Sequence, residues 1–337
     1  LSQCRSRVLE PAVRDRLLDS ALGLVLRPEV EVAVEALRLV AHLVANPGQA
    51  PARGSSEGAE AASSEGAECP EVPGAVDEEP DSLFASTCRR LFRLMAEDDE
   101  VLNSRGELIV RRLCDGVDSE ADGVDAERFY AAAARSVAEE QDAAFAVRLV
   151  RVLYWVLLTS RETRALRARL RDDAAAAPRP GATAESEGDV PPLLMRLLLA
   201  WFHCPISTLA LCLWLHWFEL AAEVTVRLAT IPYTPDLQVQ LDSFVELFES
   251  PIFVKVRLQL LDSSQPALLR AVLGLVALLP QEQALRARLE VVKTGLLLDQ
   301  IGNQPAAPEE ELPSGCGALL EHFDAIVDQH GWRECVM

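Results

Sequence analysis

The sequence predicts an all-α fold in which antiparallel helix pairs follow one another as a HEAT-like solenoid. Apolar residues recur at intervals of three and four along most of the chain, which is the spacing of a buried helix face. No segment alternates apolar and polar residues long enough to predict a strand, and no βαβ pattern is present. Proline residues separate the periodic segments. One helix pair cannot bury both of its faces, so each pair is expected to stack on a neighbour.

The first 80 residues contain one helix pair and an acidic segment. The ranges 11–25 and 29–45 have helical spacing, and we expect residues 1–46 to form a HEAT-like pair at the end of a longer array. The chain starts at Leu1 rather than at Met, which indicates a fragment. Residues 47–80 contain the six-residue sequence Ser-Ser-Glu-Gly-Ala-Glu twice. This composition predicts a disordered acidic linker.

Residues 81–172 are predicted to continue the helical repeats. Five helices are expected there, at 81–95, 103–114, 125–139, 142–160 and 161–170. Asp81 and Asn103-Ser104 are the expected N-terminal caps of the first two. The helix at 142–160 has the broadest apolar stripe and should lie centrally, whereas 161–170 is basic and should lie at the surface. Residues 173–190 are rich in Ala, Pro, Gly and Glu and form a second predicted disordered linker.

Residues 191–300 are predicted to form a C-terminal helical region, followed by a linker and a short terminal helix within 301–337. Helices are expected on either side of Pro205 and at 218–230, 236–249, 251–261, 266–279, 281–291 and 317–329. Pro205 and Pro251 suit the first turn of a helix, where a missing N–H has no cost. The ranges 251–261 and 266–279 are expected to pair.

The run from Leu193 to Ala222 is the most apolar part of the chain and contains three of its five tryptophans. Two interpretations are a buried soluble core and a membrane hairpin. A membrane span needs about 20 largely apolar residues. Arg196, the break at His203-Cys204-Pro205 and His216 divide this run into shorter pieces. We therefore predict a soluble core without a transmembrane segment.

The net charge of −20 is concentrated outside the predicted helices. Residues 46–81 carry nine acidic residues against one arginine, residues 172–190 carry five against one, and Glu309-Glu-Glu311 adds three more. The helical part is therefore close to neutral. Nucleic acids and anionic lipid surfaces require clustered Lys and Arg, so neither is an expected direct partner.

Eight cysteines are spread along the chain without a CxxC pair. Four lie inside apolar helices, which favours buried free thiols in a reducing cytosol over disulfides. His203, Cys204, Cys212 and His216 could be considered as metal ligands or as a Cys/His nucleophile. They lack the paired ligand spacing of structural zinc sites, and their aromatic and aliphatic surroundings do not favour a reactive thiolate. We predict no catalytic residue, no metal and no cofactor.

The aromatic residues of 193–262 have two interpretations, as core and as partner-binding surface. Trp and Arg are frequent interface anchors, and the aromatic density exceeds what a thin helical layer usually buries. Lys255 and Arg257 are either solvated surface charges or contacts for a partner carboxylate. The candidate partner-binding residues are Trp201, Phe202, Pro205, Trp214, Trp217, Pro251, Phe253 and Arg257.

Several stretches occur in the order found in one family of scaffold proteins. They include Trp201-Phe-His-Cys-Pro-Ile-Ser-Thr-Leu-Ala-Leu-Cys-Leu213, Glu249-Ser-Pro-Ile-Phe253, Arg257-Leu-Gln-Leu-Leu-Asp262, Arg105-Gly-Glu-Leu-Ile-Val-Arg-Arg-Leu-Cys114 and Leu273-Gly-Leu-Val-Ala-Leu-Leu-Pro280. This ordered set resembles the C-terminal region of the ArPIKfyve family of vacuole-morphology scaffolds, the helical-repeat subunits of the phosphatidylinositol 3-phosphate 5-kinase complex. The resemblance covers residues 81–299, and 8–46 resembles a generic repeat.

The resemblance implies a non-catalytic scaffold in the synthesis and turnover of phosphatidylinositol 3,5-bisphosphate. It implies three kinds of partner for 191–300 and the chain as a whole: a Sac-domain phosphoinositide phosphatase, a PIKfyve-type lipid kinase, and further copies of the chain. It also implies a cytosolic protein that is peripheral on endosome or vacuole membranes. Two alternatives are a generic HEAT-like trafficking adaptor and a helical Cys/His enzyme. Partner-dependent stability would favour a scaffold, and activity of the purified chain on a phosphoinositide would favour the enzyme.

Overall fold

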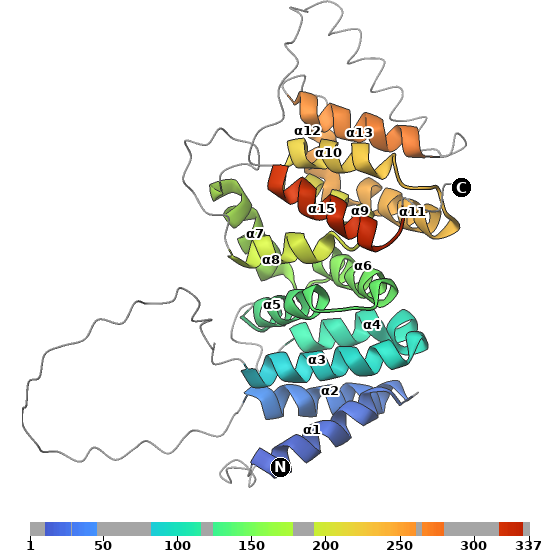
Figure 1. Cartoon of the computed structure of the whole chain (residues 1–337). Coiled ribbons are helices and arrows are strands. Elements are labelled where there is room, and N and C mark those ends of the chain that lie inside the picture. The colour runs from blue at the N-terminus through green and yellow to red at the C-terminus, as the bar shows by residue number, and fades with distance from the viewer. Residues whose placement is uncertain are drawn as a thin grey trace, which may run out of the picture. The chain divides into compact units, whose positions relative to one another are not determined.

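The computed structural model describes residues 11–27, 29–45, 82–115, 124–177, 192–260, 265–279 and 317–332. Within these ranges every regular element is a helix, so the predicted all-α helical-repeat fold is confirmed (Figure 1). The chain divides into two compact units, residues 1–94 and 95–337. The predicted linkers at 47–80 and 301–316, most of the linker at 173–190, and the predicted helix at 281–291 lie outside the described residues.

The first unit contains the predicted N-terminal helix pair. Helices α1 (Pro11–Val25) and α2 (Val30–Ala45) pack against each other. Their contact buries apolar side chains spaced at threes and fours, among them Leu18, Leu22, Leu37 and Val40. Arg90 of α3 (Ser82–Glu97) forms an ion pair with Asp19 of α1.

The second unit begins with helices that follow the predicted order. These are α4 (Asp99–Cys114), α5 (Val124–Ala138), α6 (Ala143–Thr159) and α7 (Arg164–Ala176). The predicted start of α4 at Asn103 is wrong, because the Asp98 carboxylate accepts the Glu100 N–H at 3.1 Å and caps the helix earlier. Helix α6 is central as predicted: it contacts α4, α5 and α9, and Asp142 caps its first turn.

A sharp turn separates α6 from α7, and two side chains hold it. The two helices meet at 93°. The Thr163 hydroxyl donates to the Leu157 carbonyl at 2.9 Å, and the Arg167 guanidinium donates to the same carbonyl at 2.8 Å. Carbonyls at the end of α6 have no partner within the helix, so these donors satisfy them. Helix α7 is amphipathic rather than wholly superficial, since Leu166, Leu170 and Ala174 are buried.

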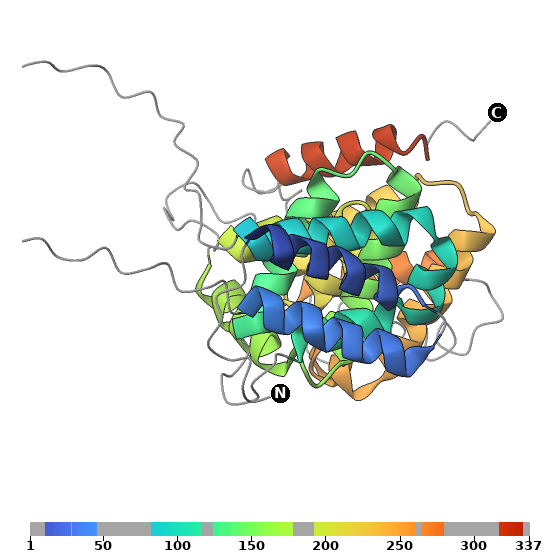
Figure 2. The same ribbon diagram turned by 90° about the horizontal axis from the view of Figure 1, so that it is seen from below.

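The remaining helices form the C-terminal part of the second unit. They are α8 (Pro192–Trp201), α9 (Pro205–Trp214), α10 (Phe218–Leu228), α11 (Pro235–Glu249), the 3-10 turn η2 (Pro251–Phe253), α12 (Val254–Gln259), α13 (Pro266–Leu278) and α15 (Gly317–Gln329). Helix α9 contacts α6, α8, α10 and α11, so it lies inside this part. Helix α15 contacts α8 and lies at the outside of the unit (Figure 2).

The main partner of α13 is α10, and not the α12 segment that precedes it in the chain. The two helices lie side by side in Figure 1. They approach closely at Gly274, where an added Cβ would lie 2.5 Å from Cγ2 of Thr225. A side chain at this position of α13 would therefore separate the two helices. The predicted pairing of 251–261 with 266–279 is wrong in this respect.

No single helix in the described ranges is both long and apolar enough to cross a membrane. The sharply bent α6–α7 pair reaches the required length and composition only when the two helices are taken together.

Candidate partner-binding region

The tryptophan-rich segment forms a buried core. The exposed fractions of Trp201, Trp214 and Trp217 are 0%, 1% and 2%. Trp201 ends α8, and its ring lies 6.4 Å from that of Tyr130 on α5. The Tyr130 hydroxyl donates to the Leu153 carbonyl of α6 at 2.9 Å. Burial raises the pKa of Tyr130, so its phenol stays a neutral donor that ties α5 to α6.

The break between α8 and α9 forms as predicted, and buried polar groups satisfy it. Pro205 occupies the first turn of α9, where its missing N–H leaves no orphan donor. The Thr208 hydroxyl donates to the Trp201 carbonyl at 2.7 Å. The Cys204 thiol accepts from the Ser207 hydroxyl and donates to Oε1 of Gln240 on α11 at 3.3 Å. Burial raises the pKa of the Cys204 thiol, which is the opposite of what a nucleophilic cysteine requires.

An aromatic cluster joins α11 to η2 and α12. Phe244, Phe248 and Phe253 lie with their ring centroids within about 6 Å of one another, and all three are fully buried. The Ser250 hydroxyl accepts from the Ile252 N–H at 3.3 Å and turns the chain into η2. The Arg257 guanidinium donates to the Phe248 carbonyl, which satisfies a carbonyl near the end of α11.

The eight candidate partner-binding residues divide unequally between core and surface. Only Pro251 is exposed, and Arg257 is half-buried. The other six are buried within the chain: Trp201, Phe202, Pro205, Trp214, Trp217 and Phe253. Packing is therefore the role that the structure gives these six side chains, and their participation in partner binding stays a prediction.

The terminal helix α15 is built into this region through its contacts with α8 and α10. Phe323 is fully buried and meets Phe202 edge to face at 5.4 Å between ring centroids. Asp324 accepts from Arg227 of α10 at 3.1 Å. Sequence reasoning treated this helix as an appendage. Its apolar residues at helical spacing, Leu320, Phe323 and Val327, were a signal that it packs.

A pair of histidines lies where α15 ends beside α8. Nδ1 of His203 and Nε2 of His330 are 3.0 Å apart, and Trp332 stacks on His330 with centroids 4.2 Å apart. Burial, and then the neighbouring His203, lower the pKa of His330 to about 4. Burial and His322 lower the pKa of His203. Two cationic imidazoles at this separation would repel, so a neutral pair holds α15 in place.

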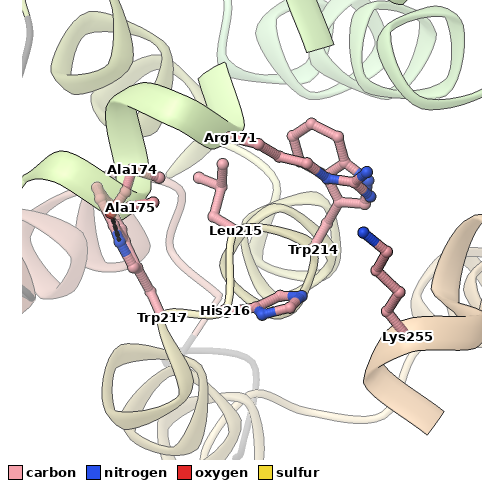
Figure 3. A pocket seen from close by; sticks show the side chains of 8 residues that line it. All are labelled: Arg171, Ala174, Ala175, Trp214, Leu215, His216, Trp217 and Lys255. Atoms are coloured by element: carbon pink, nitrogen blue, oxygen red, sulfur yellow. Dashed lines mark hydrogen bonds between the residues drawn. The ribbon is translucent and has the colours of Figure 1, made fainter. Parts of the chain in front are cut away.

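The residues around Trp214 line a pocket of about 300 Å³ (Figure 3). Arg171 of α7 lies over the Trp214 ring, with its guanidinium carbon 4.3 Å from the centroid. His216 and Trp217 line the pocket where α9 leads into α10, and Lys255 lines it from α12. The indole N–H of Trp217 donates to the Ala174 carbonyl at 3.4 Å and joins α10 to α7.

The four residues that had been considered as metal ligands have separate environments. His203 faces His330, Cys204 contacts Ser207 and Gln240, and His216 stacks on Phe218. In the part of the chain that the structure describes, no three His, Cys, Asp or Glu side chains are placed to hold a metal ion. The four cysteines within it, at 88, 114, 204 and 212, are buried free thiols.

Comparison with known proteins gives one family. Residues 99–292 match the family described as the vacuolar protein 14 C-terminal region that binds the factor-induced gene four product, a Sac-domain phosphatase. The chain is 35% identical over 252 residues to "Protein VAC14 homolog" of Schizosaccharomyces pombe and 34% identical over 229 residues to the protein of the same name in Arabidopsis thaliana. It is 27% identical over 205 residues to "Vacuole morphology and inheritance protein 14" of Saccharomyces cerevisiae.

These alignments cover most of the chain but a minority of each relative. They include 73%, 66% and 60% of this chain, against 29%, 28% and 21% of the three relatives. No solved structure matches the chain. The family match begins at the start of α4 and extends beyond α13, so it contains the tryptophan-rich core.

Proposed function

Since the chain belongs to the VAC14 family, we propose that it is a non-catalytic scaffold that binds a Sac-domain phosphoinositide phosphatase. In this proposal it acts in the complex that makes and turns over phosphatidylinositol 3,5-bisphosphate. The observation that carries the proposal is the match of residues 99–292 to a family described by the binding of such a phosphatase. That match spans 194 of the 337 residues and includes helices α4 to α13 of the second unit.

The architecture suits a binding role. In the described ranges the second unit is built from short helices joined by tight, well-capped turns, as at Asp142, Thr234 and Ser250. Such stacked helices present extended surfaces to partners and are held in register by their neighbours. The thiol that sequence analysis considered for chemistry, Cys204, is fully buried and has a raised pKa, which supports a non-catalytic function.

We place the phosphatase contact at the exposed side of η2 and α12. Pro251 is exposed, and Val254 and Leu258 are exposed by 43% and 61%. The last two are four residues apart and therefore share one face of α12. The polar half-buried Arg257 lies beside them. Exposed apolar side chains around a charged residue are typical of an interface core with its rim.

A binding measurement tests the function and the surface separately. The chain is titrated against the purified cognate phosphatase, and Leu258→Asp is compared with Leu39→Asp. Leu39 is 42% exposed on α2, outside the family match, and serves as the matched control. We expect Leu258→Asp to weaken binding about tenfold or more, with Leu39→Asp unchanged.

The two failures are distinguishable. If the wild-type chain does not bind the phosphatase, the proposed function is wrong. If the wild-type chain binds and Leu258→Asp binds equally well, the function stands and the contact surface lies elsewhere in 99–292.

Binding of a PIKfyve-type kinase and self-association complete the proposal, together with a peripheral position on endosome or vacuole membranes. The chain spans less than a third of the relatives that it matches, so these roles are tested with the whole protein. Recovery of the kinase, the phosphatase and two differently tagged copies of the scaffold in one purified assembly would support them. A scaffold that binds the phosphatase only as a monomer would contradict self-association.

A further inference from the structure

Three basic side chains from separate elements meet at the pocket beside Trp214. Arg171 comes from α7, His216 follows α9, and Lys255 comes from α12 (Figure 3). Among the described residues that line this pocket, none is acidic. Within the same described ranges, no carboxylate forms an ion pair with Arg171 or Lys255. The pocket therefore concentrates positive charge, although the chain as a whole carries −20.

Arg171 is held in a way that leaves its donors available. Its guanidinium face lies over Trp214, 4.3 Å from the ring centroid. A stacked guanidinium keeps its in-plane N–H groups free for oxygen atoms. Its Nε is buried and has no hydrogen-bond acceptor in the described part of the chain. Burial also lowers the pKa of Arg171, so the charge lies in an environment that a bound anion would make more favourable.

His216 is fixed on the pocket wall by an unusual backbone conformation. Its φ of 63° is left-handed, a conformation for which glycine is the ordinary choice at a helix end. The Trp217 N–H donates to the Cys212 carbonyl at 2.9 Å and the His216 N–H to that of Leu213 at 3.2 Å, which closes α9. The imidazole stacks on Phe218 at 5.4 Å with an interplanar angle of 20°. A residue other than glycine in this conformation is strained, and such residues are concentrated at functional sites.

We propose that this pocket binds the phosphate group of a small soluble phosphate monoester. A phosphate monoester carries a charge of about −1.5 to −2 and three acceptor oxygens at neutral pH, which suits three converging basic groups better than a single carboxylate does. The volume of about 300 Å³ accommodates a small molecule. Recognition of an anionic membrane surface uses clusters of about four to eight basic residues, more than this pocket supplies.

Calorimetric titration of the full chain at constant ionic strength tests this proposal. Glycerol 2-phosphate and inorganic phosphate are the probes, and phosphatidylserine vesicles are the third. Arg171→Met retains a long side chain over Trp214 and removes the charge, and Lys255→Met removes the exposed cation. Arg270→Met is the matched control, because Arg270 is exposed on α13 and does not line the pocket.

We expect saturable binding of glycerol 2-phosphate at one site, weakened about tenfold by Arg171→Met and by Lys255→Met and unchanged by Arg270→Met. If Arg171→Met fails to fold, Lys255→Met decides the question, because that side chain is exposed. The absence of saturable binding, or an equal loss in Arg270→Met, would overturn the proposal. Vesicle binding that is lost in Lys255→Met would overturn the assignment to a soluble ligand.

Discussion

Replacement of Gly274 by alanine tests the close packing of α10 against α13. The added Cβ would lie 2.5 Å from Cγ2 of Thr225, about 0.9 Å short of an ordinary contact. Thr225 is buried, and its hydroxyl donates to the Ala221 carbonyl at 2.8 Å, so its rotamer is held in place. The substitution therefore forces the two helices apart rather than displacing a flexible side chain.

Two effects of opposite sign set the magnitude. Overpacking of a well-packed core costs about 1–3 kcal/mol. Alanine in place of glycine inside a helix contributes about 1 kcal/mol of stability. We expect Gly274→Ala to lower the free energy of unfolding by up to about 2 kcal/mol. In a Thr225→Ser background Cγ2 is absent and the next atom, Cβ of residue 225, lies at 3.5 Å, so the same substitution should stabilise the protein.

Urea denaturation followed by tryptophan fluorescence measures this cycle in the relevant unit. All five tryptophans lie in residues 95–337, so their emission reports on that unit. Gly23→Ala is the control, because a Cβ at that position of α1 meets nothing within 4 Å, and it should not destabilise. If Gly274→Ala has the same effect in both backgrounds to within about 0.5 kcal/mol, the steric reasoning is refuted.

Three further predictions concern the core, a cap and the terminal helix. Trp201→Ala should lower the free energy of unfolding by about 3–5 kcal/mol, and phosphatase binding should be lost only together with helical circular dichroism; loss of binding in a folded variant would contradict its role as core. Asp142→Ala should cost about 1 kcal/mol in urea denaturation through the lost cap of α6, and an unchanged midpoint would count against that cap. The folded-state pKa of His330 lies below its ordinary value of 6.5, so the stabilisation is complete above pH 6.5 and is lost as pH falls toward about 4. Discounted for the half-exposed ring, it amounts to about 1–2 kcal/mol, and a lower melting temperature at pH 5 than at pH 7.5 that His330→Gln abolishes would confirm it; an equal decrease in His330→Gln would contradict it.

The local features of the fold could be predicted from the sequence because their causes are local. The apolar stripe of 142–160, the break at Pro205 and the turn at Ser250-Pro251 each depend on a few neighbouring residues, and each occurs where it was expected. The start of α4 was misplaced because Asp98 and Asn103 are both acceptable caps, and only packing selects between them.

The contacts between distant helices could not be predicted in the same way. Nothing in the sequence near Gly274 indicates that its neighbour is Thr225, or that Arg171 lies over Trp214. Burial of Trp214 and Trp217 also depends on these long-range contacts, so their aromatic character alone left core and interface unresolved. The pocket beside Trp214 is assembled from three elements and has no sequence motif of its own.

The central claim, that the chain is a scaffold for a Sac-domain phosphatase, is tested most directly by the mass of the co-expressed pair. Size-exclusion chromatography with light scattering gives that mass without a label. We expect the chain of 36.8 kDa and its cognate phosphatase to elute together, with a mass that contains at least one copy of each. Separate elution of a folded chain and a folded phosphatase, each with its own mass, would contradict the claim.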